Sequence, residues 1–181
     1  MSEKYQSKKS QIKSYKLQDK WVIWGHELHN SDWSPASYKK LYEFDTIQDF
    51  WVFFNNIRHF RDFMLFIMRG DILPIYEDTM CINGGYWSYV VPTKELSDSI
   101  QRLMIRMIGE TLTDTEMYGE IVGMSVSPKG SRGVIKIWNK NKNNRHSLQL
   151  YLKDKYFLNA RYTPHIKDNQ DNKQDNARVQ I

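Results

Sequence analysis

The chain has 181 residues and a formal net charge of +5, which fits one basic domain that buries roughly two-thirds of its unfolded surface and favours a polyanionic partner. Its single cysteine, Cys81, excludes an internal disulfide, and its five histidines lack the spacing of zinc ligands, so we expect a reducing compartment and no metal. No apolar run approaches the ~20 residues that span a bilayer, and residues 1–16 lack the apolar segment of a signal peptide, so we expect a soluble, cytoplasmic protein without membrane association.

Lys, Asn, Gln, Asp and Ser dominate both ends of the chain, over residues 1–14 and 166–181. Such segments cannot bury enough apolar surface to offset the entropy that is lost on ordering. We therefore expect a disordered N-terminal tail and a flexible C-terminal tail on either side of one folded domain at 15–165.

Two segments have the periodicity of amphipathic helices. Thr46 followed by Asp49 resembles a capping box, and the apolar residues after it recur at helical spacing, which predicts a helix over 47–60. A longer apolar stripe with spacings of three and four predicts a second helix over 93–108, which Gly109 ends.

Shorter apolar segments between Gly, Pro and Asp turns are typical of strands. They lie at 21–24, 64–68, 87–91, 120–126 and 134–138. Residues 145–157 fit a third helix, but alternation within this segment also fits a strand, and both remain open. Strands interspersed with two or three helices predict an α+β fold in which one face of a sheet is covered.

Three residues carry the chemistry of a candidate binding pocket. Trp33 lies in a polar loop, where a large ring serves either to stack on a ligand or to anchor the loop. Tyr76 offers a second aromatic face for a cationic ligand, and the alternative is a strand-end tyrosine with its hydroxyl in water. Glu77 offers two acceptor oxygens, which match the adjacent N1–H and N2–H₂ donors of guanine, unless it is an ordinary solvated carboxylate.

A basic turn further along the chain supplies the cations that a phosphate-bearing ligand needs. Lys129 and Arg132 flank a glycine-containing turn between two predicted strands. Both side chains are suited to phosphate contacts, and the alternative is a solvated basic hairpin. Together with the aromatic and acidic residues, they favour a cationic purine that carries phosphates.

Short motifs along the chain resemble, in the same order, those of the cap-binding translation initiation factor 4E family, from residue 15 to residue 165. The motifs are WVIW at 21–24, FDTIQDFW at 44–51, IYED at 75–78, GGYW at 84–87, IGE at 108–110 and IKIW at 135–138. The resemblance implies a non-enzymatic protein that binds the 7-methylguanosine cap of mRNA in translation initiation and needs no cofactor. It also implies a curved antiparallel sheet with about three helices on its convex face and the cap site on its concave face.

The resemblance assigns roles to the residues of the candidate pocket. Trp33 and Tyr76 would sandwich the methylated guanine, and Glu77 would bind its edge. Trp138 matches a pocket-wall tryptophan near the methyl group, although a core role in its strand is equally compatible. Lys129 and Arg132 match the region that contacts the cap phosphates. The chain departs from the family at three positions of this pocket. Tyr76 stands where the family usually has Trp, Tyr86 where it often has Arg, and Ser127 where it has Arg or Lys.

A second surface is expected on the two predicted helices. Trp51 lies roughly 80° from the centre of its helix's apolar stripe, taking ~100° per residue, and Ile105 points away from the stripe of its own helix. Exposed apolar side chains on two helices indicate a partner site. The resemblance places Ile47, Trp51, Ile105 and Glu110 on the face that binds a helix of a scaffold initiation factor or of a repressor.

Three alternatives to a scaffold-recruiting cap-binding factor remain open. Departures from the family at Gln101 and Arg102 leave open a translational repressor that occupies caps without recruiting a scaffold. A general single-stranded RNA-binding protein would use the same basic and aromatic residues without base preference. A hydrolase would need a general base, for which Glu77 and Asp78 form the only obvious carboxylate pair. In each case we expect a monomer before a partner binds.

Overall fold

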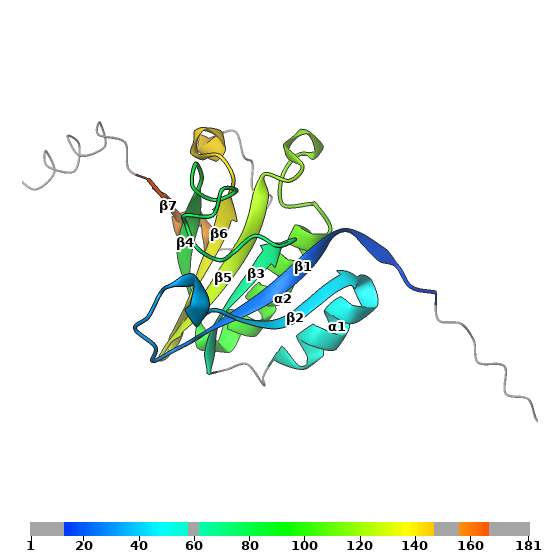
Figure 1. Ribbon diagram of the computed structural model, residues 1–181, viewed down its shortest axis with the longest axis horizontal. Coiled ribbons are helices and arrows are strands. Elements are labelled where there is room, and N and C mark those ends of the chain that lie inside the picture. The colour runs from blue at the N-terminus through cyan, green and yellow to red at the C-terminus, as the bar shows by residue number, and fades with distance from the viewer. Residues whose placement is uncertain (1–12, 58–61, 147–155, 167–181) are drawn as a thin grey trace, which may run out of the picture.

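Seven antiparallel strands form one sheet in the computed structural model, which describes residues 13–57, 62–146 and 156–166 (Figure 1). The strand order is β2-β1-β3-β5-β6-β4-β7. The strands are β1 (Lys16–Glu27), β2 (Lys39–Thr46), β3 (Phe63–Arg69), β4 (Gly85–Pro92), β5 (Ile121–Lys129), β6 (Arg132–Asn139) and β7 (Arg161–Pro164). The α-helices are α1 (Ile47–Asn55) and α2 (Thr93–Ile108), and 3₁₀ turns lie at Pro35–Ser37, Thr115–Met117, Lys142–His146 and Phe157–Asn159.

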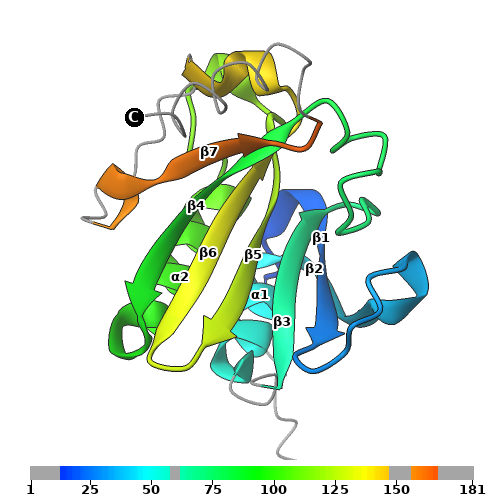
Figure 2. The same cartoon turned by 90° about the vertical axis from the view of Figure 1, so that its left-hand side faces the viewer.

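Both α-helices cover the same face of the sheet, behind the strands in Figure 2. The main core lies between the two layers and includes Ile23, Ile67, Met124, Ile135 and Ile137 from the strands and Phe50, Phe53, Leu103 and Met107 from the helices. Because successive side chains of a strand point to opposite faces, the residues between these strand positions project away from the helices. This second face therefore remains open to a ligand wherever no other segment covers it.

A smaller apolar cluster lies on that second face. It consists of Phe66, Met68, Ile72, Cys81, Val122 and Trp138. Two of its members, Ile72 and Cys81, belong to the connection between β3 and β4, which packs over one end of the sheet. The cluster gives this face an apolar floor.

The two predicted helices are present, but one is shorter than predicted. Thr46 caps α1, since its Oγ1 accepts a hydrogen bond of 3.0 Å from the Asp49 N–H. The helix ends at Asn55 rather than at residue 60, because Asn56 leaves the helical conformation and its side chain donates to the Val52 carbonyl at 2.7 Å. Helix α2 has the predicted bounds, and Gly109 follows it as its C-cap.

Each predicted strand overlaps an observed one, but β2 and β7 were not predicted. Both are edge strands, and β2 begins with two exposed lysines, so neither has the apolar alternation of an inner strand. The segment at 145–157, for which helix and strand both remained open, falls mainly outside the described residues. The described residues contain two α-helices rather than the expected three or so. The predicted tails also lie outside them, apart from residues 13, 14 and 166, so the domain boundaries stay predictions.

Candidate functional site

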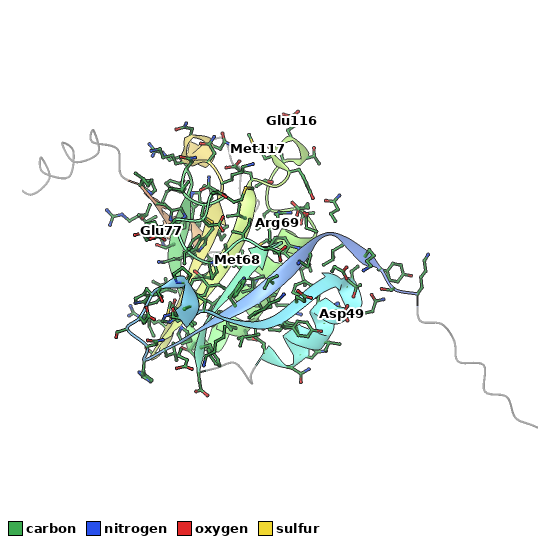
Figure 3. The ribbon with its side chains drawn as sticks, in the orientation of Figure 1. Asp49, Met68, Arg69, Glu77, Glu116 and Met117 are labelled. Carbon is green, nitrogen blue, oxygen red and sulfur yellow. The ribbon has the colours of Figure 1, made fainter. Side chains whose placement is uncertain are left out.

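A cavity of about 390 Å³ opens on the side of the sheet away from the helices, since its floor residues Phe66 and Trp138 belong to the smaller apolar cluster. Its walls come from segments far apart in the sequence, namely Trp33 and Tyr38 before β2, Met64 and Phe66 of β3, residues 74–77 before β4, Tyr86 of β4, Ser125 and Ser127 of β5, Lys136 and Trp138 of β6, and His165 after β7. Figure 3 shows Glu77 on one side of the molecule and Asp49 of α1 on the other. The cavity thus lies opposite the helical surface.

Trp33 is held at the cavity by a buried ring and a polar turn. The ring of His26, which is fully buried, stacks on it with centroids 4.0 Å apart and an interplanar angle of 5°. The imidazole Nε2 lies 2.7 Å from the Asp32 carbonyl oxygen, and the Asp32 carboxylate accepts hydrogen bonds from the N–H and the hydroxyl of Ser34. These bonds from Ser34 also lower the pKa of Asp32. Trp33 remains 52% exposed, so one face is supported and the rest is available to a ligand.

Asp78 organises the loop that presents Tyr76 and Glu77. Its carboxylate accepts hydrogen bonds from the backbone N–H groups of Leu73 and Met80, each at 2.9 Å. These bonds engage both carboxylate oxygens of Asp78 in the turn. Tyr76 stays outside the packed part of the loop and is 53% exposed.

The charge of Glu77 acts on two tyrosines around it. Its carboxylate accepts a hydrogen bond from the Tyr76 hydroxyl, which raises the pKa of Tyr76. Burial, together with the negative charge of Glu77, raises the pKa of Tyr38 to about 12. Both tyrosines are therefore neutral hydrogen-bond donors at neutral pH, and Glu77 is a carboxylate at an aromatic rim.

Trp138 forms the buried floor of the cavity. Its indole N–H donates to the Ser125 hydroxyl at 3.2 Å, and its ring packs on Phe66. Trp138 lines the cavity and also belongs to the apolar cluster. It therefore has both of the roles that the sequence left open, the pocket wall and the core of its strand.

His165 packs against the Trp138 ring, with the two centroids 4.8 Å apart. Burial, with a smaller effect of the positive charge of Lys136, lowers the pKa of His165 to about 4. His165 is therefore neutral at pH 7, and its Nε2 has no hydrogen-bond partner among the described residues. No sequence pattern pointed to His165, because it reaches the cavity through the pairing of β7 with β4.

Lys136 is the one lysine or arginine among the described residues that line the cavity. The sequence analysis did not single it out. Its Nζ lies 4.2 Å from the centroid of the Tyr86 ring. The predicted cations Lys129 and Arg132 instead face each other at the exposed end of the β5–β6 hairpin and are not among the lining residues. Direct contact of these two with a ligand phosphate stays a prediction, while Ser127 of the same hairpin does reach the cavity.

A family model described as eukaryotic initiation factor 4E matches residues 16–180. The chain belongs to this family. Initiation factor 4E-1 of Prunus domestica is 31% identical over 141 residues, which are 71% of this chain and 58% of that protein. The isoform 4E of Arabidopsis thaliana is 30% identical over 140 residues, which are 72% of this chain and 69% of the relative. The chain spans 58–60% of the length of the 4E-1 proteins of Prunus domestica and Arabidopsis thaliana.

Solved structures of 4E proteins share the architecture. The complex of C. elegans eIF4E-3 with the 4E-binding protein Mextli and a cap analog superposes with a TM-score of 0.72 at 22% identity, covering 90% of this chain and 96% of that one. Ascaris suum eIF4E-3 with the m7G cap gives a TM-score of 0.69 at 25% identity, covering 87% and 94%. The predicted class, a curved antiparallel sheet with helices on one face, is confirmed.

The helical face of this 4E chain exposes apolar side chains, as the sequence predicted. Ile47 and Ile105 are each 42% exposed and Trp51 is 37% exposed, with the Trp51 ring resting edge-on against Phe50 and Phe54. Sequence periodicity did not single out a further exposed residue of α1, Val52. A role of these residues in partner binding stays a prediction.

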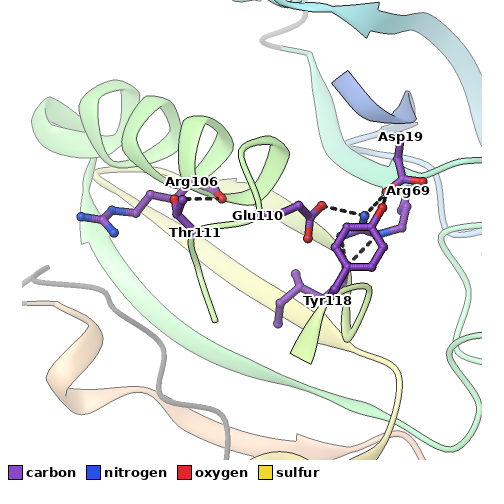
Figure 4. Close-up of polar contacts among 7 residues, drawn as sticks. Asp19, Arg69, Arg106, Glu110, Thr111 and Tyr118 are labelled. Carbon is purple, nitrogen blue, oxygen red and sulfur yellow. Dashed lines mark hydrogen bonds and ion pairs between the residues drawn. The ribbon is translucent and has the colours of Figure 1, made fainter. Parts of the chain in front are cut away.

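Glu110 does not share this exposed surface. It follows α2 with a φ of 53°, and its carboxylate bonds to the Arg69 guanidinium at 2.7 Å (Figure 4). Arg69 is buried, also pairs with Asp19, and donates twice to the Ile121 carbonyl. Burial alone lowers the pKa of Arg69, but the bonds and charges of Glu110 and Asp19 raise it overall. Glu110 thus connects the end of α2 to the sheet, and its predicted contact with a partner remains untested.

In the part of the chain that the structure describes, no cluster of three His, Cys, Asp or Glu side chains could hold a metal ion. No described helix is both long and apolar enough to cross a membrane.

Proposed function

We propose that this chain binds the 7-methylguanosine cap of mRNA and acts in translation initiation by recruiting a scaffold initiation factor. The observation that carries the proposal is the cavity itself, where the half-exposed rings of Trp33 and Tyr76 accompany the carboxylate of Glu77. Membership of the 4E family supports it, as does the likeness to Ascaris suum eIF4E-3, whose structure contains the m7G cap.

The chemistry of the cavity suits a methylated guanine. Methylation at N7 makes the base cationic, so each aromatic face contributes cation–π attraction of ~0.5–2 kcal/mol beyond ordinary stacking. Glu77 accepts from N1–H and N2–H₂ of guanine, and such charge-assisted bonds contribute ~1.5–3 kcal/mol. The negative charge of Glu77 also favours the positive charge of the methylated base. Trp138 provides an apolar floor beneath them.

The arrangement favours binding over hydrolysis. Both oxygens of Asp78 accept backbone hydrogen bonds in the loop, so this neighbour of Glu77 is not free to share general acid–base work. Glu77 is the one carboxylate among the described lining residues. The proposed protein is therefore a non-enzymatic factor, and we place it in the cytoplasm, where translation occurs.

The partner surface of the proposal is the outer face of α1 and α2, with Trp51 and Ile105 as its apolar contacts. A helix of the scaffold factor would cover them. A repressor role is the alternative, because α2 presents the exposed, charged Arg102 on its surface.

The test is a fluorescence titration with 7-methyl-GTP and with GTP. The methylated nucleotide should bind at least about tenfold more tightly, which corresponds to about 1.4 kcal/mol. Glu77→Ala should abolish retention on cap resin, whereas Glu116→Ala, which removes an exposed carboxylate at the top of the molecule in Figure 3, should not. Equal affinities for the two nucleotides would contradict the proposal, and competition by uncapped RNA would favour the general RNA-binding alternative.

A further inference from the structure

Two opposite charges face the same cavity without neutralising each other. Glu77 lies on the β3–β4 connection and Lys136 lies in the middle of β6, and both line the cavity. Among the described residues, neither forms an ion pair, although surface lysines such as Lys16 and Lys20 do. A ligand that fills this cavity therefore meets a negative and a positive charge, neither of which an ion pair with another described residue neutralises.

Lys136 is held in place by its neighbours rather than extended into solvent. It pairs with Ser88 of β4 and Ser125 of β5, and its side chain is half-buried on the same face as Trp138. Its ammonium group lies over the Tyr86 ring, 4.2 Å from the centroid, within the range of a cation–π contact. Tyr86 thus orients the cation toward the cavity.

Hydroxyl groups complete a set of donors around the ammonium. Ser125 and Ser127 line the cavity beside Lys136. The Ser125 oxygen accepts from the Trp138 indole, which leaves its own hydroxyl hydrogen available to donate. An ammonium with adjacent hydroxyls is a donor set that suits a phosphate group.

Distance along β6 separates Lys136 from the hairpin cations. Lys136 is two residues from the floor residue Trp138, or ~7 Å along the strand, whereas Arg132 is six residues away, or ~20 Å. Lys129 pairs with Arg132 and lies equally far out. Of these three cations, Lys136 is the one close enough to meet a group attached directly to a nucleoside that is bound on Trp138.

We infer that Lys136, positioned by Tyr86, binds the phosphate nearest the base and makes the cavity select a nucleotide over a nucleoside. The inference rests on the proposed function for the identity of the base. Lys129 and Arg132 would then contact at most the phosphates that lie further from the base.

The test measures how each variant responds to the first phosphate. ¹⁵N-labelled protein would be titrated with 7-methylguanosine, 7-methyl-GMP and 7-methyl-GTP, following the tryptophan indole signals. Lys136→Gln should weaken binding of the monophosphate by about tenfold, because it removes a charge-assisted bond. Binding of the nucleoside should change less than about twofold. Lys136→Arg should restore part of the loss, and the control Lys94→Gln, on the exposed surface of α2, should resemble wild type.

The positioning role of Tyr86 is tested in the same way. Tyr86→Phe keeps the ring and should retain the preference for the monophosphate, whereas Tyr86→Leu should lose part of it. Thermal unfolding would verify that the variants being compared are folded.

Three results would overturn the inference. Equal losses for nucleoside and monophosphate in Lys136→Gln would mean that Lys136 acts on the base or the fold. An unchanged affinity for the monophosphate would mean that it contacts no phosphate. A larger loss of monophosphate binding in Lys129→Gln or Arg132→Gln would assign the first phosphate to the hairpin. Failure of the proposed function is distinct, because it appears in wild type as equal binding of methylated and unmethylated nucleotides.

Discussion

Removing the ring behind Trp33 should weaken ligand binding although the removed residue never touches the ligand. His26 is fully buried and stacks on Trp33 with centroids 4.0 Å apart, so it fixes the plane in which Trp33 meets a base. In His26→Ala this support is lost, and the freed tryptophan must be ordered when the ligand binds. A stacked aromatic pair contributes ~0.5–1.5 kcal/mol, so affinity for 7-methyl-GTP should fall by about 2- to 10-fold.

The same change should reduce stability by a separate route. The Asp32 carbonyl oxygen lies 2.7 Å from His26 Nε2 and can only accept, so it loses its donor in His26→Ala. Asp32 is exposed, so water can replace the lost donor, and losing this hydrogen bond costs about 0.5–1.5 kcal/mol of unfolding free energy, in addition to the cost of the cavity that the missing ring leaves. His26→Phe is the matched control, because it keeps a ring against Trp33 while losing the same hydrogen bond.

The assay combines a tryptophan fluorescence titration with urea unfolding. We expect both variants to lose stability, but only His26→Ala to lose affinity beyond about twofold. If folded His26→Ala binds 7-methyl-GTP as tightly as wild type, the stack does not prepare Trp33 for the ligand. If His26→Phe is as weak as His26→Ala, the hydrogen bond to the loop matters and the ring does not.

Three further predictions concern the rim, the helical face and pH. Tyr76→Trp should hold or raise affinity for cap analogue by enlarging the stacking face, whereas Tyr76→Ala and Trp33→Ala should each lose ~1–3 kcal/mol; unchanged binding in Tyr76→Ala would remove Tyr76 from the site. Trp51→Ala and Ile105→Glu should leave cap affinity within ~0.5 kcal/mol and abolish co-purification of scaffold factor on cap resin, and undisturbed scaffold recovery would reject this surface. Burial lowers the pKa of His165 from 6.5 to about 4, so between these pH values the unfolded chain takes up a proton that the folded chain does not, and stability falls as the pH decreases. Urea unfolding at pH 7 and pH 5 should show this loss reduced by about 1–2 kcal/mol in His165→Phe, and an identical loss in both proteins would mean that His165 is not buried in its neutral form.

The sequence determined the elements whose patterns are strong within one segment. Helix α2 was predicted at Thr93–Ile108 because its apolar residues recur at helical spacing before a glycine. The inner strands were predicted because each is a short apolar run between turns, while β2 and β7 escaped because edge strands are polar on more of their surface. Local chemistry also singled out Trp33, Tyr76 and Glu77, since large rings and a carboxylate on polar loops have little to do in a core, and all three line the cavity.

Only the tertiary structure decided which distant side chains meet those three. Alternation shows that Lys136 and Ile137 lie on opposite faces of β6, but not which face bears the cavity, since that depends on the side that the helices cover. The basic hairpin looked the better phosphate site in sequence, yet strand length places Lys129 beyond the cavity and Lys136 within it. His165 arrives through the pairing of β7 with β4, whose partner residues lie 73–79 positions apart in the sequence. Local periodicity reports the environment of one segment, whereas a binding site depends on how the sheet's register brings separate segments together.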